Sequence, residues 1–168
     1  NSPVARRRDI RFPGARFTAG AGAESRRCSL ERIFLDTNII IYANDRRDPK
    51  KQALARTVVS GLMRSKSGVL STQVLQEYAS VAISKLGQKE DVVLRQLKLL
   101  ETLEVVSQTP AMIRRGVELK KLYGIQFWDA CIIANAEAAG CDTLYSEDLN
   151  TGQFYSGIRV KNPLSGVE

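Results

Sequence analysis

The sequence predicts an α/β protein, in which a parallel β-sheet carries helices on both faces. Apolar runs of three or four residues, the length of buried strands, alternate with longer segments whose apolar residues recur at helical spacing. The chain has 168 residues, of which 43% are hydrophobic and 26% are charged. These values suit one globular domain that folds without a metal or a disulfide.

The predicted elements follow one another in a regular order from Arg32 onward. The first strand, Ile33-Phe34-Leu35, stops at Asp36, and a brief helical turn is expected after it. Asp48-Pro49 and Thr109-Pro110 are typical helix starts, and Gly87 is a typical helix end. Strands are expected at 33–35, 68–71, 104–106, 143–145 and 158–160, and helices at about 49–65, 72–86, 89–102, 110–124 and 128–139.

The net charge of +7 is concentrated at the start of the chain. Residues 1–32 contain eight arginines and three acids, whereas residues 33–168 are nearly balanced. We therefore expect residues 1–31 to be a basic, disordered extension and residues 32–168 to be the functional domain. A transit-like segment and a misassigned start are the alternatives for this extension. Bulk charge alone does not mark the domain as a nucleic-acid binder.

Composition excludes several kinds of chemistry. The chain has no histidine, which removes Ser-His-Asp hydrolysis and every metal site built on imidazole. Its three cysteines, Cys28, Cys131 and Cys141, form no CxxC pair, so neither a disulfide framework nor a thiolate zinc site is expected. No apolar run is long enough for a membrane span, and the start resembles no secretory signal. The chain is therefore expected to be cytoplasmic.

Four acids occupy positions where a parallel sheet would gather them. Asp36 and Asp148 follow the first and fourth strands, Asp129 lies in the first turn of a helix, and Glu77 lies in the first half of the helix after the second strand. Ligands of such sheets bind beyond the carboxyl ends of the strands, and carboxylate oxygens suit Mg²⁺ or Mn²⁺. Each acid also has a purely structural interpretation. Asp36 could cap a helix, Asp129 could favour the helix dipole, Glu77 could lie on a solvated face with Gln73, and Asp148 could belong to a polar turn.

Four motifs resemble those of the PIN-domain family, and in particular the VapC-type ribonuclease toxins of type II toxin–antitoxin pairs. They are Phe34-Leu35-Asp36-Thr37-Asn38, Gln76-Glu77-Tyr78, Phe127-Trp128-Asp129-Ala130, and the most specific, Leu144 to Gly152 followed by Val160-Lys161-Asn162-Pro163. The resemblance implies a PIN-like α/β/α sandwich with a Rossmann-like, mainly parallel sheet of four to five short strands.

The resemblance also implies the site residues. The acids of the family map onto Asp36, Glu77, Asp129 and Asp148, which would be the catalytic residues and would hold one or two Mg²⁺ or Mn²⁺ ions. Supporting polar positions map onto Thr37, Asn38 and Ser146. Glu147 is the alternative to Asp148 as the fourth acid, and we prefer Asp148 because the family's acid falls two residues after the Ser/Thr.

The expected function is metal-assisted hydrolysis of an RNA phosphodiester. Trp128 is expected to pack at a helix start, with stacking on a base as the alternative. The resemblance further implies a homodimer and a cognate antitoxin whose C-terminal segment lies across the active cleft, and an apolar groove formed by the helices at 53–63 and 74–86 could receive such a segment. Possible RNA phosphate contacts, each of which could equally be a solvated charge, are Arg46, Arg47, Lys50, Lys51, Arg114 and Arg115.

Two other functions share features with this sequence. A haloacid-dehalogenase-like phosphatase also begins with Asp after its first strand, but it needs a second Asp where this chain has Asn38. A catalytically silent module that binds RNA or protein is the second rival. Such a module would be expected to have lost one of the metal-binding acids, and all four are present.

Overall fold

The computed structural model describes residues 31–166, so the extension predicted at 1–31 lies outside the described residues except for Glu31. Twelve elements follow one another in this part of the chain. They are β1 Ile33–Leu35, α1 Thr37–Asn44, α2 Pro49–Ser65, β2 Gly68–Ser71, α3 Thr72–Ser84, α4 Glu90–Leu100, β3 Glu104–Val106, α5 Pro110–Tyr123, α6 Phe127–Ala138, β4 Thr143–Tyr145, β5 Phe154–Tyr155 and β6 Ile158–Lys161.

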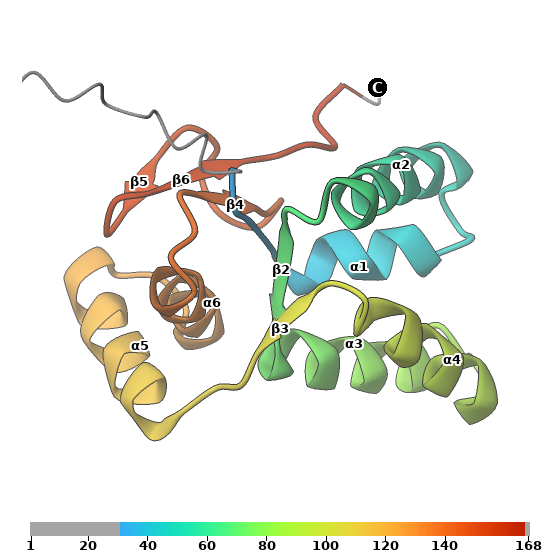
Figure 1. Cartoon of the computed structure of the whole chain (residues 1–168), viewed down its shortest axis with the longest axis horizontal. Helices are drawn as coiled ribbons and strands as arrows, with labels where there is room; N and C mark the ends of the chain where they lie inside the picture. The colour runs from blue at the N-terminus through green and yellow to red at the C-terminus, as the bar shows by residue number, and fades with distance from the viewer. Residues whose placement is uncertain (1–30, 167–168) are drawn as a thin grey trace, which may run out of the picture.

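The sheet has the order β3-β2-β1-β4-β6-β5, and every pairing is parallel except the β5–β6 pair. Helices α1 to α4 lie on one side of the sheet and α5 and α6 on the other (Figure 1). This confirms the predicted α/β architecture. From β1 the chain moves outward to β2 and β3, and then crosses back to β4 on the other side of β1. The order therefore reverses between β1 and β4, the place where such sheets bind ligands.

Two expectations differ from the structure. The sheet has a sixth strand, β5, with only two residues, which is too short to produce a recognisable periodicity. The turn expected after Asp36 is a helix of eight residues, α1, with five buried members. Its apolar residues Ile39, Ile40 and Ile41 are β-branched and helix-neutral at best, so burial rather than intrinsic propensity stabilises this helix.

The helix starts follow the capping chemistry of the sequence. The Asp48 carboxylate accepts the Lys51 amide at 3.0 Å to begin α2, and the Thr109 hydroxyl accepts the Met112 amide at 3.3 Å to begin α5. Helices α5 and α6 cross closely at Gly116, where an added Cβ would lie 2.6 Å from the Cys131 sulfur. The central strands and their covering helices form one core that includes Phe34, Leu35, Leu70, Tyr78 and Leu144.

None of the helices within residues 31–166 combines the length and the apolar character needed to span a membrane.

Candidate active site

All four predicted acids line one cleft at the carboxyl ends of the strands. Asp36 follows β1, Asp148 follows β4, Glu77 projects from α3 and Asp129 from the first turn of α6. The cleft has a volume of about 400 Å³. A second hollow of about 220 Å³ shares Asp129 and Asp148 with it and continues toward Asn150 and Tyr155. The strand reversal between β1 and β4 thus places four carboxylates around a common space.

Asp36 is the buried acid of the cleft, and only 5% of its surface is exposed. Its carboxylate accepts the Thr37 amide at 2.7 Å and thereby caps α1, as the structural interpretation anticipated. The same carboxylate also accepts the Ser146 hydroxyl at 2.7 Å. Because one oxygen faces the cap and the other faces β4, Asp36 is fixed at the junction of β1, α1 and β4.

Asn38 joins two of the acids. Its amide nitrogen donates to Asp36 at 3.1 Å and to Asp148 at 3.0 Å, and it is buried. An ionised aspartate at this position could donate to neither carboxylate and would add a third charge between them. The Asn38 amide therefore acts as a hydrogen-bond donor to both acids. The second Asp that a haloacid-dehalogenase-like phosphatase needs at this position would, when ionised, only accept hydrogen bonds.

Glu77 is held from both sides. The Thr37 hydroxyl donates to one carboxylate oxygen at 2.9 Å, and the Gln73 amide donates to the other at 2.8 Å. The same Gln73 nitrogen also lies 3.2 Å from the Trp128 carbonyl oxygen, and this contact ties α3 to the start of α6. Glu77 thus belongs to a hydrogen-bonded cluster rather than to a freely solvated face.

Gln73 belongs to a network of buried amides that sequence reasoning missed. Only 2% of its surface is exposed, which rules out the interpretation that it lies on a solvated face. Its carbonyl oxygen accepts both the Asn135 and the Gln108 amide nitrogens at 3.0 Å, so its own nitrogen must point toward Glu77. Asn135 also donates to the Ser71 hydroxyl at 3.2 Å. The available signal was Asn135, an amide within the apolar stretch Ala130–Ala136 of α6.

Electrostatic repulsion and burial act together on these acids. Burial, with smaller contributions from the charges of Asp129 and Asp148, raises the pKa of Asp36 to about 7 although the Ser146 and Thr37 hydrogen bonds oppose it. Burial and the charges of Asp148 and Glu77 likewise raise the pKa of Asp129. Among residues 31–166 none of the four acids forms an ion pair with a basic side chain. Their negative charge is thus not offset within the described chain.

Glu147 and Asp148 have different surroundings. The Glu147 carboxylate forms an ion pair with Lys51, whose ammonium group also lies 3.7 Å from the centre of the Tyr42 ring. Burial opposes ionisation of Glu147, but the hydrogen bonds from Lys51 and Tyr42 outweigh it and lower its pKa. Asp148 instead lines the cleft and accepts from Asn38. This placement favours Asp148 as the fourth acid of the cluster.

The predicted phosphate contacts are scattered. Lys51 is engaged by Glu147, and Arg115 by Glu137 and Glu118. Arg115 reaches α6 eight residues beyond Asp129, which is about 12 Å along the helix. Arg46 and Arg47 line a separate pocket beyond the end of α1. Lys50 and Arg114 are exposed on α2 and α5. None of these six residues lines the acidic cleft itself.

Trp128 is not the packing residue we expected. It lines the cleft with 63% of its surface exposed, and its indole makes an edge contact with the ring of Phe127, at 5.4 Å between ring centroids. An exposed aromatic ring at the rim of a cleft can stack on a planar ligand.

The donors of the cleft fit a hard divalent cation. Carboxylate, hydroxyl and amide oxygens are present, no thiolate lines the cleft, and the buried acid Asp36 is destabilised by its own charge. Within the described residues no three acidic or thiol side chains already converge tightly enough to enclose a metal ion. The arrangement is an open one, in which carboxylates of the cleft would supply some of the ligands of the ion and water or a substrate would supply the rest, as Mg²⁺ prefers.

The comparisons with known proteins agree with this fold. The PIN domain family model matches residues 33–155, and the chain therefore belongs to the PIN domain family. No curated protein matches the sequence significantly.

Solved structures with the same fold include toxins of toxin–antitoxin systems. VapC20 of Mycobacterium tuberculosis, a sarcin–ricin loop cleaving toxin, is 20% identical with a TM-score of 0.55 and is matched over 68% of this chain and 88% of its own. A toxin–antitoxin complex from Klebsiella pneumoniae is 23% identical with a TM-score of 0.58, over 78% and 97%. DNA-bound VapBC from Salmonella typhimurium is 16% identical with a TM-score of 0.59, over 79% and 98%. At these identities the likeness is one of fold.

Proposed function

We propose that this protein is a Mg²⁺- or Mn²⁺-dependent endoribonuclease and the toxin of a toxin–antitoxin pair. The observation that carries the proposal is the cleft in which Asp36, Glu77, Asp129 and Asp148 meet without a basic partner among the described residues. Membership of the PIN domain family and the fold shared with VapC toxins support it. A cluster of uncompensated carboxylates is costly unless a cation or a proton neutralises it.

The roles of the residues follow from their contacts. A divalent cation bound by the four acids would activate water and offset the negative charge of the phosphate. Thr37 and Gln73 hold Glu77 in place, and Asn38 keeps Asp36 and Asp148 at a fixed separation. Ser146 orients Asp36 by donating its hydroxyl proton. Trp128 at the rim is placed to stack on a base of a single-stranded RNA.

We further propose that a segment of a cognate antitoxin covers an apolar pocket between α2 and α4. This pocket has a volume of about 280 Å³ and is floored by α1, with Ile40, Val59, Met63, Leu99 and Leu100 among its lining residues. The groove expected from the sequence used α3, but α4 supplies that wall instead. The complexes from Klebsiella pneumoniae and Salmonella typhimurium support an antitoxin partner. A cytoplasmic location stays a prediction.

A homodimer also stays a prediction from the resemblance. The apolar side chains of Ile113 and Val117 are exposed four residues apart on α5 and would suit such an interface.

The experiment that tests the enzymatic proposal compares wild type with Asp36→Asn. Each protein, purified without a partner, is incubated with a structured RNA pool in EDTA, Mg²⁺ or Mn²⁺. We expect cleavage that needs the metal and is lost in Asp36→Asn. Glu137→Gln is the matched control, because Glu137 lies on α6 but is paired with Arg115 outside the cleft, and it should cleave like wild type.

Two other results would count against the proposal. Equal cleavage by wild type and Asp36→Asn would mean that the acids are not involved. RNA binding without metal-dependent cleavage of any RNA in the pool would instead favour the silent binding module.

A further inference from the structure

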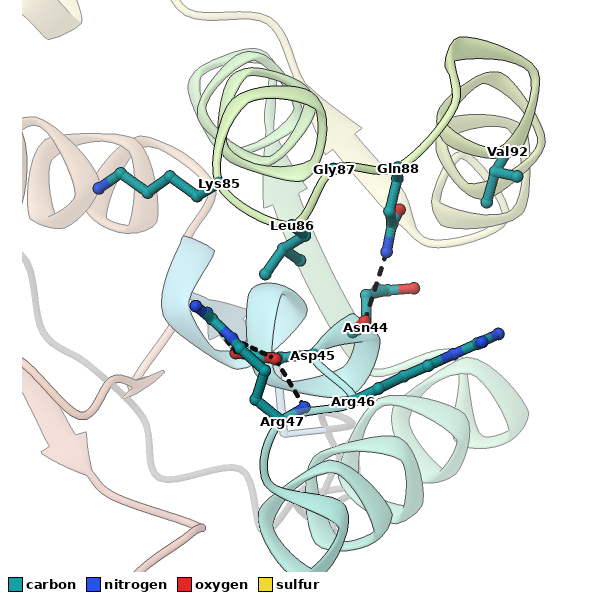
Figure 2. A pocket seen from close by; sticks show the side chains of 9 residues that line it. All are labelled: Asn44, Asp45, Arg46, Arg47, Lys85, Leu86, Gly87, Gln88 and Val92. Atoms are coloured by element: carbon teal, nitrogen blue, oxygen red, sulfur yellow. Dashed lines mark hydrogen bonds and ion pairs between the residues drawn. The ribbon is translucent and has the colours of Figure 1, made fainter.

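A second pocket lies between the end of α1 and the turn that joins α3 to α4 (Figure 2). Its volume is about 350 Å³, similar to that of the acidic cleft. Three of its lining residues are basic, Arg46, Arg47 and Lys85, and only Asp45 is acidic. Figure 2 shows Arg46 extending on one side of the pocket and Arg47 folded back onto Asp45 on the other, while the Lys85 side chain extends outward from the end of α3. Basic side chains thus flank a hollow rather than an open surface.

The acid of this pocket is already neutralised. Asp45 accepts two hydrogen bonds from the Arg47 guanidinium, at 2.9 Å from Nε and 2.7 Å from Nη2, and one from the Arg47 amide. Among residues 31–166 neither Arg46 nor Lys85 forms an ion pair. The pocket therefore has an excess of positive charge, and the Asp45 carboxylate holds the Arg47 guanidinium in a fixed orientation at its edge.

The floor of the pocket is tied down by polar contacts. The Gln88 amide donates to the Asn44 carbonyl oxygen at 3.3 Å, and its oxygen accepts the hydroxyl of the buried Tyr78 at 3.4 Å. These contacts join the α3–α4 turn to the end of α1. A hollow held open in this way and flanked by cations suits an anion with several oxygen atoms, such as a phosphate diester.

The position of the pocket relates it to the acidic cleft. Helices α1 and α3 follow the neighbouring parallel strands β1 and β2 and pack against each other. The cleft begins at Asp36 and Gln73, near their starts, and extends along both helices to Ile41 and Val81, and the basic pocket lies at their ends, at Asn44 and Lys85. The eight residues of α1 span about 12 Å. A stacked single strand covers this distance in about three to four nucleotides at about 3.4 Å each, and an extended strand in fewer.

We propose that the pocket formed by Arg46, Arg47 and Lys85 binds a backbone phosphate of the RNA, within about four nucleotides of the bond held in the acidic cleft. The inference rests on the proposed ribonuclease function and adds where the substrate strand runs, which is along the α1–α3 pair. It also distinguishes Arg46 from Lys51 and Arg115, because those two side chains form ion pairs with carboxylates and Arg46 forms none among residues 31–166, while Arg47 lies at the pocket edge paired with Asp45.

The test measures binding apart from cleavage. All proteins are the full chain and carry Asp36→Asn. Fluorescence anisotropy gives the Kd of labelled dodecauridylate in Mg²⁺ at several KCl concentrations between about 50 and 200 mM. Over this range the affinity of phosphate contacts depends strongly on salt. The pocket variant is Arg46→Gln/Lys85→Gln. The matched control is Arg64→Gln/Lys121→Gln, which also removes one exposed Arg and one exposed Lys, from α2 and α5.

We expect the pocket variant to bind dodecauridylate about tenfold more weakly than the control. Its plot of log K against log salt should be less steep by about 0.7, the value for one phosphate contact on a single strand. The dinucleotide UpU, which has a single internucleotide phosphate, cannot reach both sites. Its Kd should be the same in the pocket variant and the control.

Several results would overturn the inference. One is equal binding of dodecauridylate by the pocket variant and the control. Another is unchanged RNA binding with a selective loss of affinity for a labelled octaglutamate peptide, which would assign the pocket to an acidic protein segment. The proposed ribonuclease function is tested separately, and it fails if wild type shows no metal-dependent cleavage of RNA. If wild type cleaves RNA while the pocket variant binds like the control, the function stands and the pocket assignment falls.

Discussion

The two ends of α6 carry carboxylates in opposite electrostatic situations. Asp129, in the first turn, has no basic partner among the described residues, and burial together with the charges of Asp148 and Glu77 raises its pKa. Glu137, two turns later, accepts two hydrogen bonds from the Arg115 guanidinium, at 2.8 and 3.0 Å, and one from the Ser156 hydroxyl at 2.7 Å. The Arg115 hydrogen bonds are the main reason that the pKa of Glu137 is lowered.

This difference separates two uses of an acidic side chain. The Glu137 cluster joins α5, α6 and the β5–β6 turn, and it is neutralised within the chain. The cleft acids are fixed just as firmly by Thr37, Asn38, Gln73 and Ser146, but only by neutral groups. Hydrogen bonds position these acids without cancelling their charge, so the cleft favours a cation from outside the described chain.

The largest expected effect compares the two acids of α6 directly. Asp129→Asn should lower metal-dependent RNA cleavage by at least about 10³-fold, because several kcal/mol of charge stabilisation is lost with a metal ligand. Glu137→Gln should change kcat/KM by less than about twofold, because its carboxylate lies outside the cleft. Initial rates on one RNA in Mg²⁺ measure both. Similar losses of cleavage activity in the two variants would contradict the proposal that Asp129 is catalytic and Glu137 structural.

The next largest effect should be the loss of stability caused by a negative charge placed between Asp36 and Asp148. Asn38→Asp removes the donor that bridges the two acids and adds a like charge in a buried position. We expect the free energy of unfolding in EDTA at neutral pH to fall by about 3 kcal/mol. Urea denaturation measures it, with Gln153→Glu as the control, because Gln153 is exposed on the loop after β4 and lines neither the cleft nor its extension. A loss no larger than that of the control would mean that the cleft tolerates charge without a cation.

Stability should depend on pH with opposite signs at the two sites. Burial raises the pKa of Asp36 from 3.8 to about 7, so between these values the folded protein binds more protons than the unfolded chain. The contribution of Asp36 to stability therefore falls as pH rises, by about 2 kcal/mol between pH 5 and pH 7. Urea denaturation of wild type and Asp36→Asn in EDTA isolates this contribution, and the variant should gain relative stability toward pH 7. A constant difference across this range would contradict it.

The smallest expected effect is on the structural carboxylate. Glu137 has a lowered pKa, so its stabilising contribution is present above the unfolded pKa near 4.5 and is lost as pH falls through the lower folded value. Because Arg115 and Glu137 are both about one-third exposed, solvent screening limits the effect, and Glu137→Gln should cost about 1 kcal/mol at pH 7. Thermal unfolding at two salt concentrations measures it. The difference from wild type should shrink at high salt.

The sequence allowed the order of the main elements and the positions of the acids to be predicted, because both depend on local signals. Strands such as Ile33–Leu35 are continuous apolar runs, caps such as Asp48 and Thr109 act within four residues, and parallel strands bring their carboxyl ends to one edge. The acid cluster around Asp36 and Asp148 follows from that topology without knowledge of any side-chain contact.

The features that could not be predicted from the sequence depend on contacts between segments that are distant in the chain. Gln73 meets Asn135 across 62 residues of chain, and Arg115 meets Glu137 across 22, and neither pairing has a periodic signature. The two-residue strand β5 exists only because β6 offers it a partner. Trp128 lies at a helix start, where an aromatic side chain usually packs against the protein. Its ring is exposed because it borders the cleft.

The most direct test of the central claim is Mg²⁺-dependent stabilisation at pH 7.5, measured as the Tm of wild type, Asp36→Asn and Glu137→Gln after removal of metals with EDTA. Ionic strength is held constant with KCl. We expect the Tm of wild type and Glu137→Gln to rise with Mg²⁺ concentration, as binding to the folded state alone requires, and the Tm of Asp36→Asn to stay constant. An equal rise in all three proteins, or none in wild type, would contradict the proposal that the cleft binds a divalent cation.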